Sequence, residues 1–248
     1  MGRDTAIAAV RWALRYLVAE LVVLPTRVIG LALAAGLVVL PLFTSDPYVL
    51  RVFTLASILA IFGASWDLLT GFAGQVNLGH ALFFGVAAYT SGLLNVRLGL
   101  HPWLAVPLGA LAAVVVGLVV GIPCLRLRGP YLALATLTFP IILASLIFAF
   151  PDQTGGELGI SGLTRLAATR VREYYLSLAA MFALVFAMWK ITDAKTGLLF
   201  HAIREDEIAA RVAGINTTRY KLLAFSLSGL FAGLAGAMYA HFMRIAGP

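Results

Sequence analysis

The length of the apolar stretches constrains this chain more than any other feature. Residues 68–96, for example, contain no Asp, Glu, Lys or Arg. A helix needs about 20 predominantly apolar residues to cross the hydrocarbon core of a bilayer, and several stretches reach that length. Hydrophobic residues make up 61% of the 248 positions and charged residues only 12%. These values exclude a disordered chain or a simple nucleic-acid-binding protein, and they predict an integral membrane protein.

The apolar stretches are unbroken, whereas a transmembrane β-barrel needs alternating segments of about 10 residues. We therefore predict an all-α fold, a polytopic bundle with about seven transmembrane helices. The expected helices cover residues 28–43, 49–69, 80–97, 103–124, 130–150, 174–190 and 222–243. Two Gly-x-x-x-Gly pairs, at 117/121 and 229/233, predict tight packing of the helices that carry them.

The distribution of positive charge predicts the orientation, because cytoplasmic loops of membrane proteins carry an excess of Lys and Arg. With the N-terminus inside, the inside segments are residues 1–27, 70–79, 125–129 and 190–221. These segments hold twelve of the eighteen Lys and Arg residues. The same bias accounts for the net charge of +7, so we expect no nucleic-acid partner.

We divide the chain into a cytoplasmic or interfacial N-terminal segment, residues 1–27, and a transmembrane domain, residues 28–248. Within the first, residues 7–24 have an apolar side that suits a helix lying at the membrane surface. Many spans follow it without a clear cleavage site, so it is not a cleaved signal peptide. The chain stops at Gly247-Pro248 directly after an apolar segment, and we expect further C-terminal spans to be missing.

Residues 70–80 form the most irregular part of the apolar region. Three glycines permit a backbone break there, and two amides and one imidazole add polar groups. Irregular backbone at membrane depth must be buried in protein or line a cavity, so we predict a broken or re-entrant segment. The two amides fit two roles equally well, lining a translocation pathway or bonding helices together, whereas we expect the imidazole of His80 to be structural rather than a proton relay. The pathway candidates are Gly71, Gly74, Gln75, Asn77, Gly79 and His80.

The inside segment 190–221 contains a second candidate site. Ile208, Val212 and Ile215 fall at i, i+4 and i+7 and form one apolar face of a short helix. We interpret residues 202–215 either as an amphipathic surface segment or as a helix that docks into a groove of a soluble partner. The docking candidates are Arg204, Glu205, Glu207, Ile208, Ala209, Ala210, Val212, Gly214 and Ile215.

Four motifs follow one another along the chain. The first is TGFAGQVNLGHALFFGVAAY at residues 70–89, and the second is LRLRGPYLALATL at residues 125–137. The third, at residues 154–163, contains TGG followed by GISGL. The fourth, within residues 202–215, has an Ala-Ala-x-x-x-Gly spacing, with Ile208 where a Glu-Ala-Ala pattern has its Glu. Together they resemble the permeases of branched-chain amino-acid ABC importers, of the LivM type, over about residues 50–243.

This resemblance implies a multi-pass permease subunit of the bacterial inner membrane. The subunit would form the translocation pathway for branched-chain or related hydrophobic amino acids. The implied partners are a second permease of the same family, two cytoplasmic ABC ATPases and a soluble substrate-binding protein. We expect no cofactor in this chain, because ATP would be bound by the partner ATPases and the sequence contains no Gly-x-x-x-x-Gly-Lys-Ser/Thr loop.

Other functions stay open at this point. The same importer family could carry urea, short amides or other small polar solutes. An ion-driven secondary transporter would need an intramembrane ion site, but no predicted span holds a pair of carboxylates. A membrane enzyme would need a reactive pair, and the chain has neither a His-Glu-x-x-His nor a Gly-x-Ser-x-Gly motif. One Cys and four His exclude a Cys-rich metal site, so we predict a transport protein that is not an enzyme.

Overall fold

The computed structural model describes residues 29–248 except 45, 125–126 and 128–129. The chain divides into two compact units, Met1–Val49 and Leu50–Pro248, and each is described by itself. In the first unit the described helix is Ile29–Phe43, which agrees with the first expected span but is shorter than a typical one. The surface helix expected within residues 1–27 lies outside the described residues.

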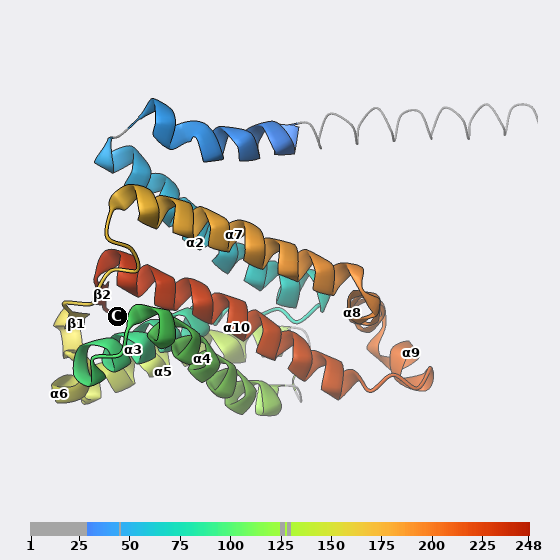
Figure 1. The fold of residues 1–248 in the computed structure, drawn as a ribbon. Helices are drawn as coiled ribbons and strands as arrows, with labels where there is room; N and C mark the ends of the chain where they lie inside the picture. The colour runs from blue at the N-terminus through green and yellow to red at the C-terminus, as the bar shows by residue number, and fades with distance from the viewer. Residues whose placement is uncertain (1–28, 45, 125–126, 128–129) are drawn as a thin grey trace, which may run out of the picture. The chain divides into compact units, whose positions relative to one another are not determined.

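The second unit is a bundle of long helices (Figure 1). Among the described residues, six helices are long and apolar enough to cross a membrane. They are α2 (Pro47–Asp67, continued by a π-helix, η1, at Leu68–Phe72), α3 (Ala81–Leu98), α4 (Pro102–Cys124), α5 (Pro130–Ala149), α7 (Arg170–Asp193) and α10 (Thr217–Met243). The predicted all-α polytopic fold is therefore confirmed, and six of the seven expected spans appear as long helices.

Short elements connect these spans. The described ones are α6 (Pro151–Thr154), a 3-10 helix η2 (Gly156–Leu158), β1 (Ile160–Ser161), α8 (Lys195–Glu205), α9 (Glu207–Val212) and β2 (Ile245–Ala246). Polar caps mark where long helices begin after such connections. The Thr169 hydroxyl accepts a hydrogen bond from the backbone N–H of Arg172, and the Asn216 side chain accepts one from that of Arg219. These caps satisfy N–H groups that have no partner within α7 and α10.

Helix α10 occupies the centre of the bundle, and small residues let its neighbours approach closely. Its span is 61% buried, against 17% for α5 and for α7. A Cβ atom added at Gly233 would lie 2.9 Å from the Ala110 Cα atom of α4. One added at Gly229 would lie 3.4 Å from the Phe83 ring of α3. The Gly-x-x-x-Gly pair of α10 thus serves packing within this chain, as its spacing predicted.

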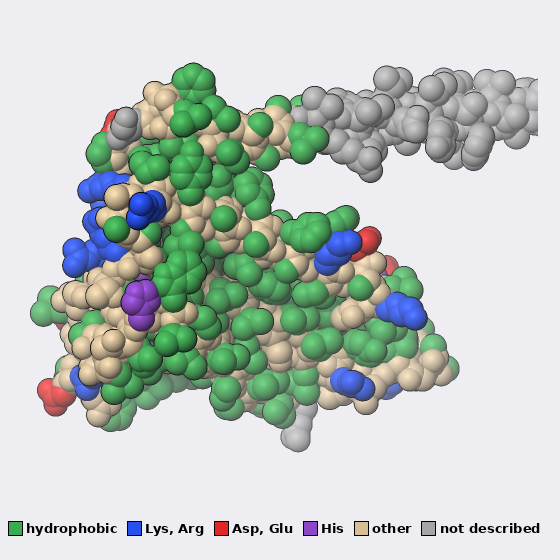
Figure 2. Space-filling view, in the orientation of Figure 1, with side chains coloured by type: hydrophobic (Ala, Val, Ile, Leu, Met, Phe, Trp, Pro, Cys, Tyr) green, Lys and Arg blue, Asp and Glu red, His purple; other side chains and the backbone are tan. Residues whose placement is uncertain are grey.

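The two ends of the bundle carry different structures, as Figure 1 shows. At one end β1 pairs antiparallel with β2, joining the segment before α7 to the segment after α10. Arg97, at the end of α3, donates hydrogen bonds there to the carbonyl oxygens of Asp152 and Gln153. Helices α8 and α9 lie at the opposite end. Figure 2 shows hydrophobic side chains across the middle of the bundle and Lys and Arg side chains toward its ends, the pattern expected for a bilayer-spanning protein.

The close approach of α10 to α3 provides a test of this packing. A Cβ atom at Gly236 of α10 would fall onto the carbonyl group of Phe84 in α3. We expect Gly236→Ala to destabilise the bundle by about 1–3 kcal/mol, the usual cost of overpacking. The measurement is the thermal unfolding midpoint of the purified protein in detergent. The matched control is Gly63→Ala in α2, where the added methyl meets open space and should be neutral or stabilise by up to about 1 kcal/mol. Equal midpoints for both variants would contradict the packing argument.

The orientation of the bundle in the membrane is tested by the accessibility of single cysteines to a thiol reagent. Leu158 and Val212 lie at opposite ends of the bundle and are 84% and 86% exposed. In a chain that is expressed by itself and whose buried Cys124 is replaced by Ala, we expect Leu158→Cys to react with an impermeant thiol reagent added to intact cells. Val212→Cys should react only after the membrane is opened, because the excess of Lys and Arg places that end inside. Reaction of the Val212→Cys chain in intact cells would reverse the orientation.

Candidate functional site

The helical hydrogen-bond pattern is interrupted between η1 and α3, over residues 73–80. Three contacts with neighbouring helices hold the segment. The Trp66 indole N–H of α2 donates to the Asn77 carbonyl oxygen at 2.8 Å, and the Leu78 N–H donates to the Thr136 hydroxyl of α5 at 3.1 Å. His80 Nε2 lies 2.9 Å from the Ser65 hydroxyl. The predicted break is thus present, and protein contacts satisfy polar groups that lipid cannot.

The amide side chains of the broken segment bond within the segment itself. The Asn77 amide oxygen accepts the Gly79 N–H at 2.9 Å, and the Gln75 amide nitrogen donates to the Ala73 carbonyl at 3.3 Å. Gln75, Asn77 and His80 are all buried. These contacts favour a packing role for the three polar candidates over the equally weighted pathway role. A role in lining the pathway stays a prediction.

The glycines of this segment allow other elements to approach its backbone. Gly74 has φ +66°, and a Cβ atom there would lie 2.9 Å from the Arg204 Cγ atom of α8. A Cβ atom at Gly79 would fall onto the Thr136 carbonyl of α5. The Gly71 carbonyl accepts a hydrogen bond from the Arg204 guanidinium. The structure therefore brings part of the first candidate site into contact with Arg204 of the second.

The second candidate region consists of two helices rather than one. The sequence predicted a single helix over residues 202–215, and this is wrong, because α8 ends at Glu205 and α9 begins at Glu207. The Asp206 carboxylate accepts hydrogen bonds from the N–H groups of Ile208 and Ala209 at 2.8 and 3.0 Å. This N-cap starts a new helix and interrupts the earlier one.

Helix α9 ends as the sequence predicted, before Gly214. That residue has φ +84°, which glycine adopts without the strain of a Cβ atom. The Gly214 N–H bonds to the Arg211 carbonyl and the Ile215 N–H to the Ala210 carbonyl, the pattern of a Schellman C-cap. Ile215 therefore lies beyond the helix whose apolar face it was expected to extend.

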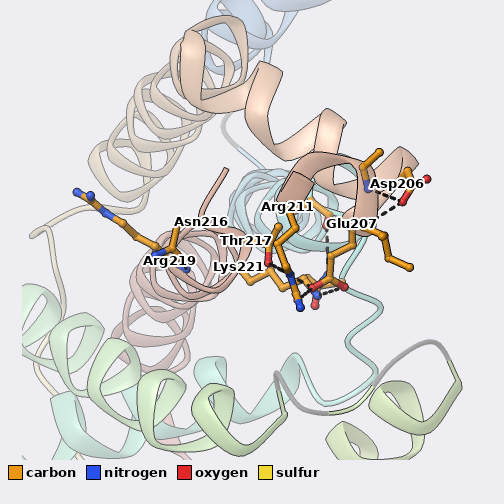
Figure 3. Close-up of polar contacts among 11 residues, drawn as sticks. Asp206, Glu207, Arg211, Asn216, Thr217, Arg219 and Lys221 are labelled. Atoms are coloured by element: carbon orange, nitrogen blue, oxygen red, sulfur yellow. Dashed lines mark hydrogen bonds and ion pairs between the residues drawn. The ribbon is translucent and has the colours of Figure 1, made fainter. Parts of the chain in front are cut away.

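Glu207 ties α9 to the start of α10 (Figure 3). One carboxylate oxygen accepts from Arg211 at 2.6 Å, and the other accepts from the buried Lys221 ammonium of α10 at 2.8 Å. Thr217 completes the cluster, 3.3 Å from the Arg211 guanidinium and 3.4 Å from Glu207. Burial alone would raise the pKa of Glu207, but the hydrogen bonds and charges of Lys221 and Arg211 hold that pKa below its usual range. Glu207 thus points into the protein rather than toward a partner.

The side of α9 away from this cluster is apolar and open. Ile208 and Val212 are 64% and 86% exposed, and Ala209 between them is also exposed. Ala210 is buried, whereas Glu205, at the end of α8, is exposed. The exposed surface formed by Ile208, Ala209 and Val212 is called the α9 apolar face below. It is the exposed apolar part of the predicted docking region.

The sequence matches a family model described as branched-chain amino acid transport system / permease component, over residues 48–248. The chain belongs to this permease family. The matched residues include the six long helices almost completely and every residue of the two candidate regions. Together the family and the apolar helices make this permease a multi-pass protein of the bacterial inner membrane.

Individual relatives of this permease support the same assignment. The high-affinity branched-chain amino acid transport system permease proteins LivM of Salmonella typhimurium and Escherichia coli are 35% and 34% identical to it, over 75% of the chain and 51% of each relative. The guanosine ABC transporter permease protein NupQ of Bacillus subtilis is 26% identical over 68% of the chain and 59% of that relative. The chain thus spans about half the length of the LivM proteins that it matches. No solved structure matches it significantly.

Several residues that shape the candidate sites were not predicted from sequence. Lys221 was counted only as an inside charge, although it holds Glu207, and Thr217 was not considered. The i, i+4 spacing of Glu207 and Arg211 was a usable signal for part of this cluster. Glu173 falls between the expected spans 130–150 and 174–190, in a connecting segment, but it is buried in the first turn of α7. Among the described residues, no three His, Cys, Asp or Glu side chains are grouped to hold a metal ion.

The Glu207 cluster predicts a pH-dependent stability. Because the folded-state pKa is below the unfolded value, the cluster stabilises fully above about pH 4.3, and this contribution is lost as pH falls through the folded pKa. We expect Glu207→Gln to lower the unfolding free energy at pH 7 by about 1.5–3 kcal/mol, the range for hydrogen bonds to charged groups. The difference from the unaltered protein should shrink below about pH 4. Thermal unfolding in detergent measures it.

The control for this experiment is Glu205→Gln, which removes the same charge from an exposed neighbouring position. It should change the unfolding midpoint little at any pH. A Glu207→Gln effect that persists undiminished at low pH would show that the ion pairs are not its cause.

Proposed function

We propose that this chain is the membrane-spanning subunit of an ABC importer and forms the translocation pathway for branched-chain amino acids. Membership of the permease family is the observation that carries this proposal. The cargo is inferred from the LivM proteins, whose names specify branched-chain amino acids and whose identity to this chain is higher than that of the guanosine permease. Urea, short amides and other small polar solutes are the competing cargoes.

In this proposal the importer contains two ABC ATPases, one bound to each permease. This chain binds its ATPase through the α9 apolar face. The face suits a groove, because Ile208 and Val212 lie one helical turn apart and project away from the Glu207 cluster. Burying one such side chain is worth about 1.5–3 kcal/mol. The Glu207–Lys221 pair gives the docked helix a direct mechanical connection to α10, the central helix of the bundle.

A second connection runs through α8. Arg204 bonds to the Gly71 carbonyl, and the His201 ring lies 5.2 Å from the Phe72 ring of the π-helix. Movement of the α8–α9 pair on nucleotide binding would therefore reach both α10 and the broken segment. We assign Arg204, His201 and Glu207 as positioning residues that transmit this movement.

The proposal includes a second permease of the same family and a soluble substrate-binding protein. Support for the second permease comes from α5 and α7, of which only 17% is buried within this chain. Such faces can meet lipid or another subunit. The binding protein would meet the end of the bundle that carries β1 and β2, which the distribution of Lys and Arg predicts to be outside and where the connection between α5 and α7 lies.

The docking step is tested by charging the α9 apolar face. We expect Val212→Asp to weaken binding of the ATPases at least about tenfold, because an apolar anchor is replaced by a charge that would have to be buried. Co-purification of the ATPases with the permease and substrate-stimulated ATP hydrolysis should both fall. The matched control for co-purification is Leu158→Asp, the same change of an apolar, exposed side chain at the opposite end, which should leave the bound ATPases in place. If Val212→Asp leaves both measurements unchanged, the ATPases dock elsewhere.

The cargo is tested by uptake of radiolabelled leucine, isoleucine and valine into cells that express the complete importer. Uptake should require this chain and hydrolysable ATP, and unlabelled branched-chain amino acids should compete whereas guanosine, ribose and urea should not. Uptake of guanosine or urea in place of leucine would assign the chain a different cargo within the same transporter class.

A further inference from the structure

A small cavity opens at the end of the bundle that carries β1 and β2. It is lined by residues of α2, α7 and α10 and of the segments that precede α7 and follow α10, and its volume is about 130 Å³. That is comparable to the roughly 150 Å³ of a protein cavity that holds one benzene molecule. The distribution of Lys and Arg places this end outside, where an imported solute would arrive.

The polar lining of the cavity is strongly basic. It consists of the four arginines Arg51, Arg165, Arg170 and Arg244, of Glu173 as the one carboxylate, and of Thr54, whose hydroxyl donates to the Leu50 carbonyl. Two guanidiniums are only partly used by the protein: Arg244 donates from Nε to the Leu163 carbonyl at 3.2 Å, and Arg51 contacts the Met243 sulfur at 3.6 Å. A guanidinium presents a planar pair of donors that matches a carboxylate. The cavity therefore favours a ligand that carries a carboxylate.

Glu173 limits which carboxylate-bearing ligand can fit. Its side chain is buried, with 6% of the residue exposed, and it lines both this cavity and an adjoining apolar void between α2, α7 and α10. Its Oε1 atom has no hydrogen-bond partner among the described residues, and the Arg165 Nε atom is 3.9 Å away. Because a buried carboxylate oxygen is stabilised by a donor, a ligand with a cationic or N–H group suits this point. A simple dicarboxylate would instead place two negative groups together.

Apolar side chains complete the lining. Leu50, Phe242 and Met243 border the cavity, and Ile58, Leu176 and Met238 border the adjoining void. The void itself is only about 10 Å³, so an aliphatic group could enter it only if these side chains moved apart. The arrangement thus offers arginines for a carboxylate, a buried acceptor for an ammonium group, and an apolar wall beside both.

We propose that this cavity is an outward-facing site for a free α-amino acid, whose carboxylate binds Arg51, Arg170 and Arg244 and whose ammonium group binds Glu173. The aliphatic side chain lies against Leu50, Phe242 and Met243. This inference rests on the proposed function for its choice of an aliphatic amino acid. It adds a site within the permease itself that receives the solute after release from the binding protein.

The test uses the complete importer in lipid nanodiscs, without the binding protein, and measures equilibrium binding of radiolabelled leucine. Two competitors test the two charged groups of leucine separately, because 4-methylpentanoate lacks the ammonium group and 3-methylbutylamine lacks the carboxylate. Both should compete at least about tenfold more weakly than leucine, the factor expected when one hydrogen bond between charged groups is lost. Competition by 4-methylpentanoate equal to that of leucine would overturn the role of Glu173.

Variants separate a binding role from a structural one. Glu173→Gln should weaken leucine binding at least about tenfold but leave the affinity for 4-methylpentanoate unchanged, which also shows that the variant is folded. Arg170→Gln should weaken both ligands. Arg172→Gln is the matched control, because Arg172 belongs to the same turn of α7 but does not line the cavity. If Arg170→Gln leaves leucine binding in the nanodiscs unchanged and weakens only binding of the soluble binding protein, measured in a separate assay, the cavity is a contact for that protein and the inference is wrong.

Comparison with uptake distinguishes the two proposals. Leucine uptake without leucine binding in the nanodisc assay would overturn this site and leave the proposed function intact. Leucine binding that depends on Glu173, in an importer that does not take up branched-chain amino acids, would overturn the proposed function and leave the site intact.

Discussion

The structure depends on one constraint: backbone polar groups inside a bilayer must find partners in the protein. Long helices meet this requirement by their own hydrogen bonds, and the interruption at residues 73–80 meets it through neighbours. Trp66 and Thr136 supply two of the necessary hydrogen bonds from α2 and α5, and Asn77 supplies a third from within. The segment can be irregular only because the helices around it are close, and Gly79 is what lets α5 approach.

A second consequence concerns how force could enter the bundle. Among the described residues, the end predicted from charge to be cytoplasmic carries the short helices α8 and α9. Helix α8 buries Phe200 in the core cluster formed by α2, α3, α4 and α10, and polar contacts add to this packing. Glu207 holds α9 to Lys221 at the start of α10, and Arg204 holds α8 to the Gly71 carbonyl beside the broken segment. Helix α10 is also the most buried of the described spans, and it packs directly against α3 and α4. A displacement of its first turn would therefore move α3 and α4 as well.

The two candidate regions differ in how well sequence reasoning described them. The apolar positions Ile208 and Val212 were identified correctly as one exposed face, because i, i+4 spacing is a local property of a helix. The helix boundary was missed, because Asp206 can lie inside a helix or cap one, and only the path of the chain decides between these. The burial of Glu173 was missed for a similar reason. A carboxylate that is close to arginines in the sequence is typical of a solvated loop, and only the packing of α7 against α2 and α10 buries it.

The sequence by itself determined the class of the protein, its spans, the break after η1 and the family. The length of apolar stretches, the glycine content and local motifs are properties of contiguous residues, so they can be identified without knowledge of the fold. Only the tertiary structure decided which polar groups meet. The Arg204–Gly71 and Glu207–Lys221 contacts join residues that are 133 and 14 positions apart. Glu173 lines one cavity with Arg51 of α2 and with Arg244, which follows α10. Such pairings depend on the relative placement of whole helices, and that placement follows from close packing at small residues such as Gly233 and Gly236 rather than from any local pattern.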